Sequence, residues 1–131
     1  MPTDTPFTSA VSLTYPPDDG AAAVARSNSV TGTYQNKVDL DLVLSGSSTH
    51  TVCFGTLATT GAKAVQIEVA PVEAGGSAAP INVIINGGSD PWEISQGGHL
   101  SLGSPAPTAA GILSMDIVHT QDACVKVRLL G

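Results

Sequence analysis

Hydrophobic and polar residues alternate with a period of two along most of the chain. The segment KVDLDLVLSG, residues 37–46, places its two aspartates, Asp39 and Asp41, on one face. The other face carries four aliphatic side chains: Val38, Leu40, Leu42 and Leu44. Because successive side chains of a strand point to opposite sides, this pattern predicts a half-buried β-strand.

The same alternation recurs in short segments, among them residues 7–15, 64–70 and 124–130. Clusters such as PPDDG, SGSS and NGGSDP separate these segments and favour turns. About nine or ten short strands without a convincing helix are expected, a spacing typical of a β-sandwich or barrel. We therefore predict an all-β, jelly-roll-like β-sandwich that forms a single domain over residues 1–131. Residues 1–6 are expected to form a short, flexible N-terminal arm.

The composition supports one ordinary core beneath a weakly charged surface. Apolar residues make up 42% of the chain and charged residues only 12%, about half the usual share. A surface rich in Ser, Thr, Gly and Ala repels other subunits weakly, which favours contact between subunits. The net charge is −6 and the basic residues form no cluster, which argues against a nucleic-acid-binding protein.

The N-terminus and the cysteines bear on the compartment. MPTDTPFTSA has neither a basic start nor an apolar run, so we expect no secretory signal. No segment is apolar over the length that a bilayer requires, so no membrane contact is expected. Cys53 and Cys124 show no CxxC spacing, and we predict that they are free, buried thiols.

A glycine pair precedes a histidine in SQGGHLSLG, residues 95–103. A phosphate-binding glycine loop opens a helix, whose N-terminal amides point at the phosphate. This segment precedes a predicted strand instead, and it contains neither GxGxxG nor GK[ST]. Gly97 and Gly98 are therefore expected to provide a positive φ between two strands.

The other candidate chemical groups are three histidines and an aspartate pair. His50 and Cys53 are three residues apart, so on a strand they point to opposite faces and cannot share a metal ion. We expect His50, His99 and His119 to be surface or edge residues, and the Asp39 and Asp41 pair to lie on a solvated face. A Ser/His/Asp triad can form from residues distant in sequence, but no GxSxG marks one. We predict no catalytic residue, metal ion or cofactor.

The C-terminal segment INVIINGGSDPWEISQGGHLSLGSPAP…GILSMDIVHTQDACVKVRLLG, residues 80–131, resembles small structural proteins of tailed-bacteriophage virions. The resemblance consists of a strand, a GG turn, a second apolar strand, a loop and two closing strands that end in LLG. It implies a β-sandwich, often trimeric, that sits on an icosahedral shell as a capsid decoration (cement) protein. It transfers no functional residue to this chain.

The expected function is accordingly a non-enzymatic bacteriophage capsid decoration protein, made in the host cytoplasm and located on the capsid surface of the virion. It would bind the outer surface of the head and bridge major capsid subunits, with a homotrimer as the expected oligomer. Phe7 and Trp92 are the candidate interface anchors. The alternative is another small phage structural protein, such as a head fibre, a tail protein or a receptor- or carbohydrate-binding sandwich. Aromatic residues total only 4%, which argues against sugar stacking, and a cupin-like enzyme would need histidines that converge inside the barrel.

Overall fold

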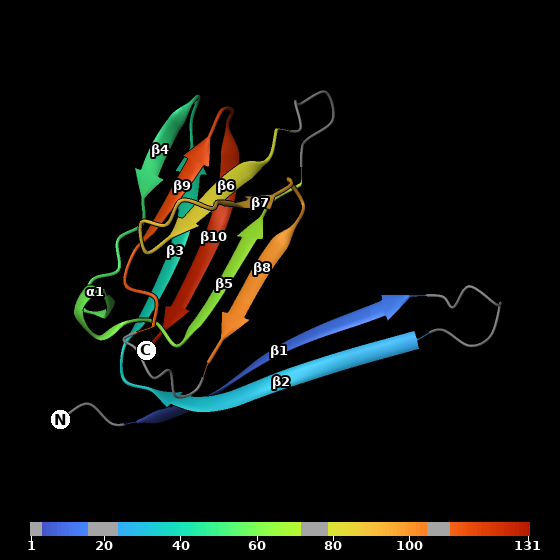
Figure 1. The fold of residues 1–131 in the computed structure, drawn as a ribbon, viewed down its shortest axis with the longest axis vertical. Helices are drawn as coiled ribbons and strands as arrows, with labels where there is room; N and C mark the ends of the chain where they lie inside the picture. The colour runs from blue at the N-terminus through green and yellow to red at the C-terminus, as the bar shows by residue number, and fades with distance from the viewer. Residues whose placement is uncertain (1–3, 16–23, 72–78, 105–110) are drawn as a thin grey trace.

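The computed structural model of the chain describes residues 4–15, 24–71, 79–104 and 111–131. Within these residues it contains ten β-strands and a single short helix, α1 (Leu57–Thr60). All strand pairings are antiparallel. The all-β prediction is therefore confirmed, and Figure 1 shows a sandwich with a long hairpin that projects from its base.

Eight of the strands form two four-stranded sheets. The first sheet has the order β3 (Lys37–Leu44), β10 (Ala123–Leu130), β5 (Ala64–Val69), β8 (His99–Gly103). The second has the order β4 (Ser48–Thr51), β9 (Met115–His119), β6 (Ile81–Ile85), β7 (Trp92–Ile94). The two sheets face each other as the layers of the sandwich (Figure 1).

The strand order is that of a jelly roll. Strands β3 and β10 pair, as do β4 and β9, β5 and β8, and β6 and β7. The eight strands thus form one long antiparallel hairpin, and its successive pairs alternate between the two sheets. Two sheets of this kind cover each other's apolar faces, which is how the fold avoids leaving a large sheet face open to water.

The core lies between the two sheets and follows the predicted alternation. In β5, Val65, Ile67 and Val69 are all buried, while Glu68 is exposed. The last two strands, β9 and β10, belong to opposite sheets, and their buried side chains face each other across the sandwich. Fully buried members of the core include Ile81, Val83, Ile117, Val127 and Leu129.

The remaining two strands, β1 (Thr5–Tyr15) and β2 (Val24–Tyr34), pair only with each other and form the hairpin. They pair in register along their whole length, from Thr5 opposite Tyr34 to Tyr15 opposite Val24. Part of the expected flexible arm, residues 1–3, lies outside the described residues. Thr5 and Pro6 already belong to β1, because they pair with Tyr34 and Thr33.

Candidate functional site

The hairpin is the most exposed apolar element of the described chain. Its strand β1 has the alternation of a core strand, but only Phe7, at the base, is buried, with 8% of its surface exposed. Val11, Leu13 and Tyr15, further along the same face, are 44%, 65% and 45% exposed. The alternating pattern of β1 predicts a buried face, but the described part of this chain leaves the distal side chains of that face exposed.

The two faces of the hairpin differ in chemistry. Directly opposed residues of an antiparallel pair point to the same side, so the register assigns each face. The face of Phe7, Val11 and Leu13 also includes Val30 and three polar residues, Ser9, Asn28 and Arg26. The other face consists of small side chains from both strands, namely Thr8, Ala10, Ser12, Thr14, Ala25, Ser27, Ser29 and Thr31. The hairpin is therefore amphipathic across its thickness.

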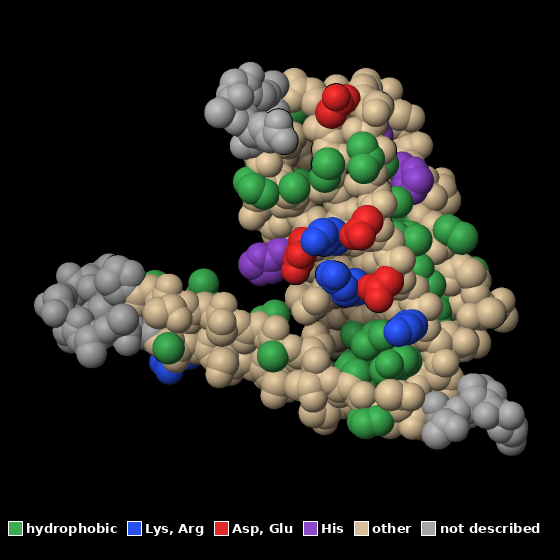
Figure 2. Space-filling model, turned by 180° about the vertical axis from the view of Figure 1, so that it is seen from behind, with side chains coloured by type: hydrophobic (Ala, Val, Ile, Leu, Met, Phe, Trp, Pro, Cys, Tyr) green, Lys and Arg blue, Asp and Glu red, His purple; other side chains and the backbone are tan. Residues whose placement is uncertain are grey.

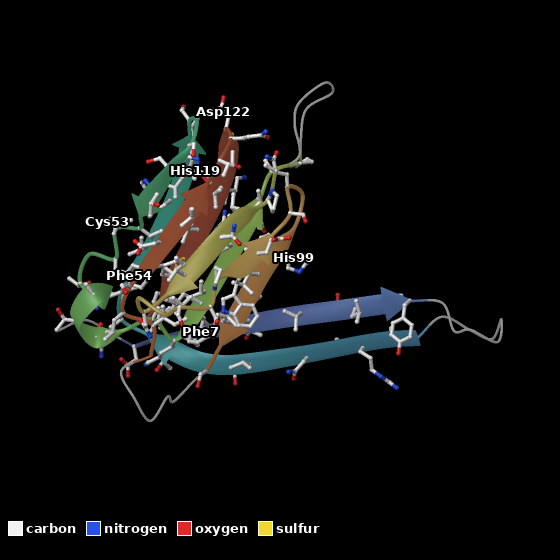
Figure 3. The ribbon with its side chains drawn as sticks, turned by 45° about the horizontal axis from the view of Figure 1, so that its top comes forward. Phe7, Cys53, Phe54, His99, His119 and Asp122 are labelled. Carbon is white, nitrogen blue, oxygen red and sulfur yellow. The ribbon has the colours of Figure 1, made fainter. Side chains whose placement is uncertain are left out.

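Contacts at the base fix the hairpin to the sandwich. The rings of Phe7 and Tyr34 lie 6.3 Å apart between centroids and are tilted by 55°. Lys63 Nζ donates to the Thr33 carbonyl oxygen at 3.0 Å. Gly103, at the end of β8, lies close to the hairpin: a Cβ atom at this position would be 3.7 Å from the side chains of Ser9 and Val30. The base of the hairpin is thus in ordinary van der Waals contact with the sandwich, and Figure 3 shows Phe7 at this junction.

A groove of about 720 Å³ separates the hairpin from the outer face of the first sheet. Ala10, Val11 and Ser12 form the hairpin side of the groove. The sheet side includes residues from all four strands, among them Val43, Glu68, His99 and Cys124. The groove is therefore a corner between two elements rather than an enclosed cavity inside the sandwich.

Charged side chains gather in the centre of that outer face, above the base of the hairpin (Figure 2). Arg128 Nε and Asp39 Oδ1 lie 3.2 Å apart, with 47% and 62% of the two side chains exposed. Lys126 is opposite Asp41 on one side and Glu68 on the other. The Asp39 and Asp41 pair therefore lies on a solvated face, as predicted, and each carboxylate is opposite a basic residue. Exposed pairs of this kind contribute little to stability.

An apolar strip adjoins the charged rows. Val43 and Cys124 are opposite each other in β3 and β10, and Val43 is 80% exposed. Both residues line the groove. Within the described residues, four of the five exposed large apolar side chains therefore lie on the hairpin or beside the groove, and the fifth is Trp92.

The structure does not bring the predicted metal-ligand candidates together. His50 is half-buried in β4, Cys53 is exposed in the following loop, and His99 lies on the far edge of the sandwich (Figure 3). Among the described residues, no group of three or more His, Cys, Asp or Glu side chains could hold a metal ion.

His119 differs from the expectation of a surface or edge histidine, because only 4% of its surface is exposed. Its Nδ1 lies 2.7 Å from the Gly46 carbonyl oxygen and 3.2 Å from that of Gln121. Both partners are acceptors, so Nδ1 carries the proton and donates. Asp122 Oδ1 accepts from the Gly46 amide at 2.6 Å. His119 and Asp122 thus tie the turn after β3 to the turn before β10.

The burial of His119 could have been predicted from sequence, since it shares the parity of the core residues Met115 and Ile117. The cysteine prediction was right about the thiols being free and wrong about their burial, because both are exposed. Cys124 has the parity of the exposed Lys126 and Arg128. Cys53 lies between the buried Val52 and Phe54, so its side chain points outward.

The positive φ predicted for Gly97 and Gly98 is present at Gly97 but not at Gly98, where a Cβ would instead lie 2.9 Å from the Ser95 carbonyl oxygen. Gly97 has a φ of +87°, and its amide donates to the Val69 carbonyl oxygen at 3.0 Å. The Gly98 carbonyl accepts from the Val69 amide, also at 3.0 Å. These bonds continue the pairing of β5 and β8 beyond the strand ends.

The two candidate anchors have opposite environments. Phe7 is buried within its own chain against Tyr34, so its ring is not available to a partner in this conformation. Trp92 is 52% exposed in β7, which is the edge strand of the second sheet. Trp92 is therefore the aromatic side chain of this pair that a second protein could reach.

Comparison of the chain with protein-family models, with curated protein sequences and with solved structures finds no match. None of the helical segments in the described residues is long and apolar enough to cross a membrane.

Proposed function

We propose that the chain is a non-enzymatic bacteriophage capsid decoration protein that binds the outer surface of the head and stabilises the shell by bridging its subunits. The observation that carries this proposal is the projecting hairpin, whose exposed Val11, Leu13 and Tyr15 have the alternation of a core strand. Exposed apolar surface of this kind marks a site of contact with another protein.

Bridging requires two separate contact surfaces on one molecule, and two exposed apolar regions support this part of the proposal. One is the hairpin, which extends beyond the sandwich (Figure 1). The other is the edge of the second sheet at Trp92. In the proposed arrangement Trp92 contacts the major capsid protein and the hairpin contacts the next subunit on the shell. Many identical weak contacts then act together, because each copy holds its neighbours close to their own sites.

The test uses capsids that lack this protein. Purified protein is added to them, and bound copies are counted after co-sedimentation. Hundreds of copies per particle at saturation are expected, and greater resistance of the shell to heat. Trp92→Ala should weaken binding by roughly 30-fold, the effect of losing about 2 kcal/mol at an aromatic anchor. Glu93→Gln, at the neighbouring exposed position, is the matched control and should bind like the wild type.

Two outcomes would contradict the proposal. A protein that does not co-sediment with capsids of its own phage is not a decoration protein. Saturation at a dozen copies or fewer would place it in the tail or portal and favour the alternative of a fibre or receptor-binding sandwich. The exposed Trp92 also suits stacking on a sugar ring, so quenching of its fluorescence by glycans of the host surface would support that alternative.

A further inference from the structure

Among the described residues, the distal half of the hairpin has neither a third strand beside it nor a surface that covers its apolar face. A two-stranded ribbon is marginally stable in water unless a third strand or another surface covers it. Strands β1 and β2 pair only with each other, and Val11, Leu13 and Tyr15 are largely exposed. A surface that covers this apolar face would therefore stabilise the hairpin as well as bind it.

The groove beside the first sheet has the chemistry to be that surface. Its floor includes Val43, the most exposed large apolar side chain of the described residues, and the neighbouring Cys124. The charged residues that line the groove are Asp41, Glu68 and Lys126, two acids against one base. The exposed charge on the apolar face of the hairpin is Arg26, opposite Leu13. The two surfaces are therefore complementary in charge.

The dimensions of the two surfaces also agree. The segment from Val11 to Tyr15 extends over about 13 Å at the usual rise of a strand. The outer strands of a four-stranded sheet lie about 14 Å apart at the usual strand spacing. One distal hairpin can therefore cross the whole outer face of the first sheet.

We propose that the distal hairpin of one copy lies in the groove of a second copy of this chain. Val11, Leu13 and Tyr15 then cover Val43 and Cys124, and Arg26 lies beside the carboxylates of Asp41 and Glu68. The contact joins two different surfaces, so each copy donates a hairpin and receives one, and the copies form a ring or a chain. The inference rests on the proposed function, for which it identifies the subunit that the hairpin contacts.

Disulfide trapping tests the contact directly. The variants carry Cys53→Ser, which leaves Cys124 as the native thiol in the groove. Leu13→Cys places a second thiol on the apolar face, and Thr14→Cys, one residue on, places it on the opposite face. Under mild oxidation, Leu13→Cys is expected to give covalent species of two or more chains, several-fold more than Thr14→Cys. Adding Cys124→Ser should abolish them.

Three results would overturn the inference. Equal cross-linking of the two variants would mean that the apolar face is not the contact. Cross-linking that survives Cys124→Ser would join two hairpins and not a hairpin to a groove. Products of single-chain mass only, whether or not a disulfide forms within the chain, would mean that the hairpin does not reach a second copy.

Light scattering of the free protein gives an independent test. Leu13→Asp and Val43→Asp should each lower the mass to that of one chain, and Thr14→Asp should not. All three side chains are exposed in the single chain, so each variant should keep the circular-dichroism spectrum of the folded wild type. A wild-type monomer at the highest soluble concentration, or unchanged association in both variants, would refute the contact. Association without capsid binding would refute the proposed function alone, and capsid binding by a monomer would refute this inference alone.

Discussion

Replacing His119 by alanine should destabilise the sandwich far more than replacing His99, although both are histidines at sheet positions. The His119 ring is 4% exposed and donates to the carbonyl oxygens of Gly46 and Gln121 at 2.7 Å and 3.2 Å. A hydrogen bond contributes about 1 kcal/mol net, and the acceptors on the exposed Gly46 and the half-buried Gln121 remain within reach of water. Because the lost ring also leaves a cavity, we expect a loss of about 3 kcal/mol in the free energy of unfolding.

The measurement is urea unfolding followed by circular dichroism, with melting temperatures from calorimetry. For a domain of this size, 1 kcal/mol shifts the melting temperature by roughly 3–5 °C, so His119→Ala should lower it by about 10–15 °C. His99→Ala removes an exposed side chain from β8 and should cost less than about 0.5 kcal/mol. Losses within that margin of each other would refute the assignment of His119 as the residue that ties the two turns.

Asp122 provides a second arm of the same experiment. Asp122→Ala removes the acceptor of the Gly46 amide, an exposed bond of 2.6 Å, and should cost about 1 kcal/mol. Both His119 and Asp122 bind Gly46, so the double variant should lose less than the sum of the single losses. Strict additivity would mean that the two side chains hold the turn independently.

Three further predictions concern the core, the turn before β8 and the thiols. Ile67→Ala should lower the free energy of unfolding by about 3–4 kcal/mol because the side chain is fully buried, and Gln66→Ala on the outer face should lower it by less than about 0.5 kcal/mol. Equal losses in urea unfolding would mean that the faces of β5 are misassigned. Gly97→Ala should lower the free energy of unfolding by about 1 kcal/mol through the positive φ alone, because a Cβ there would lie 3.7 Å from Pro71, an ordinary contact distance. An unchanged melting temperature would contradict this. At dilutions where the chain is monomeric, the native protein should add two alkyl groups without denaturant, because both cysteines are exposed in the single chain. Fewer adducts in the intact mass of the monomer would show that a thiol is protected within its own chain.

The faces of individual strands could be predicted from sequence, because alternation depends only on the geometry of one strand. Val65, Ile67 and Val69 are buried as predicted, and Asp39 and Asp41 are exposed. The partners of each strand could not be predicted in this way. Strand β3, the first strand of the sandwich along the chain, pairs with β10, the last, and no local signal in either strand specifies that pairing or its register.

The same parity argument predicts the burial or exposure of individual site residues, but it does not predict the groove. The parity of Met115 and Ile117 predicts the burial of His119, and that of Lys126 predicts the exposure of Cys124. The groove depends on where the hairpin leaves the sandwich, which is fixed by contacts between distant segments such as Ser9 and Gly103. Contacts of that kind follow from tertiary packing and leave no periodic signal in the sequence.

Alternation alone cannot distinguish a strand that is covered by its own chain from one that is covered by another. Strand β1 carries Phe7, Val11, Leu13 and Tyr15 on one face, interrupted by Ser9, yet only Phe7 is buried within the chain. An apolar face in water has a free-energy cost that increases with its area. The distal half of the hairpin keeps the pattern although Val11, Leu13 and Tyr15 stay largely exposed there, and the proposed contact with a second copy would remove this cost.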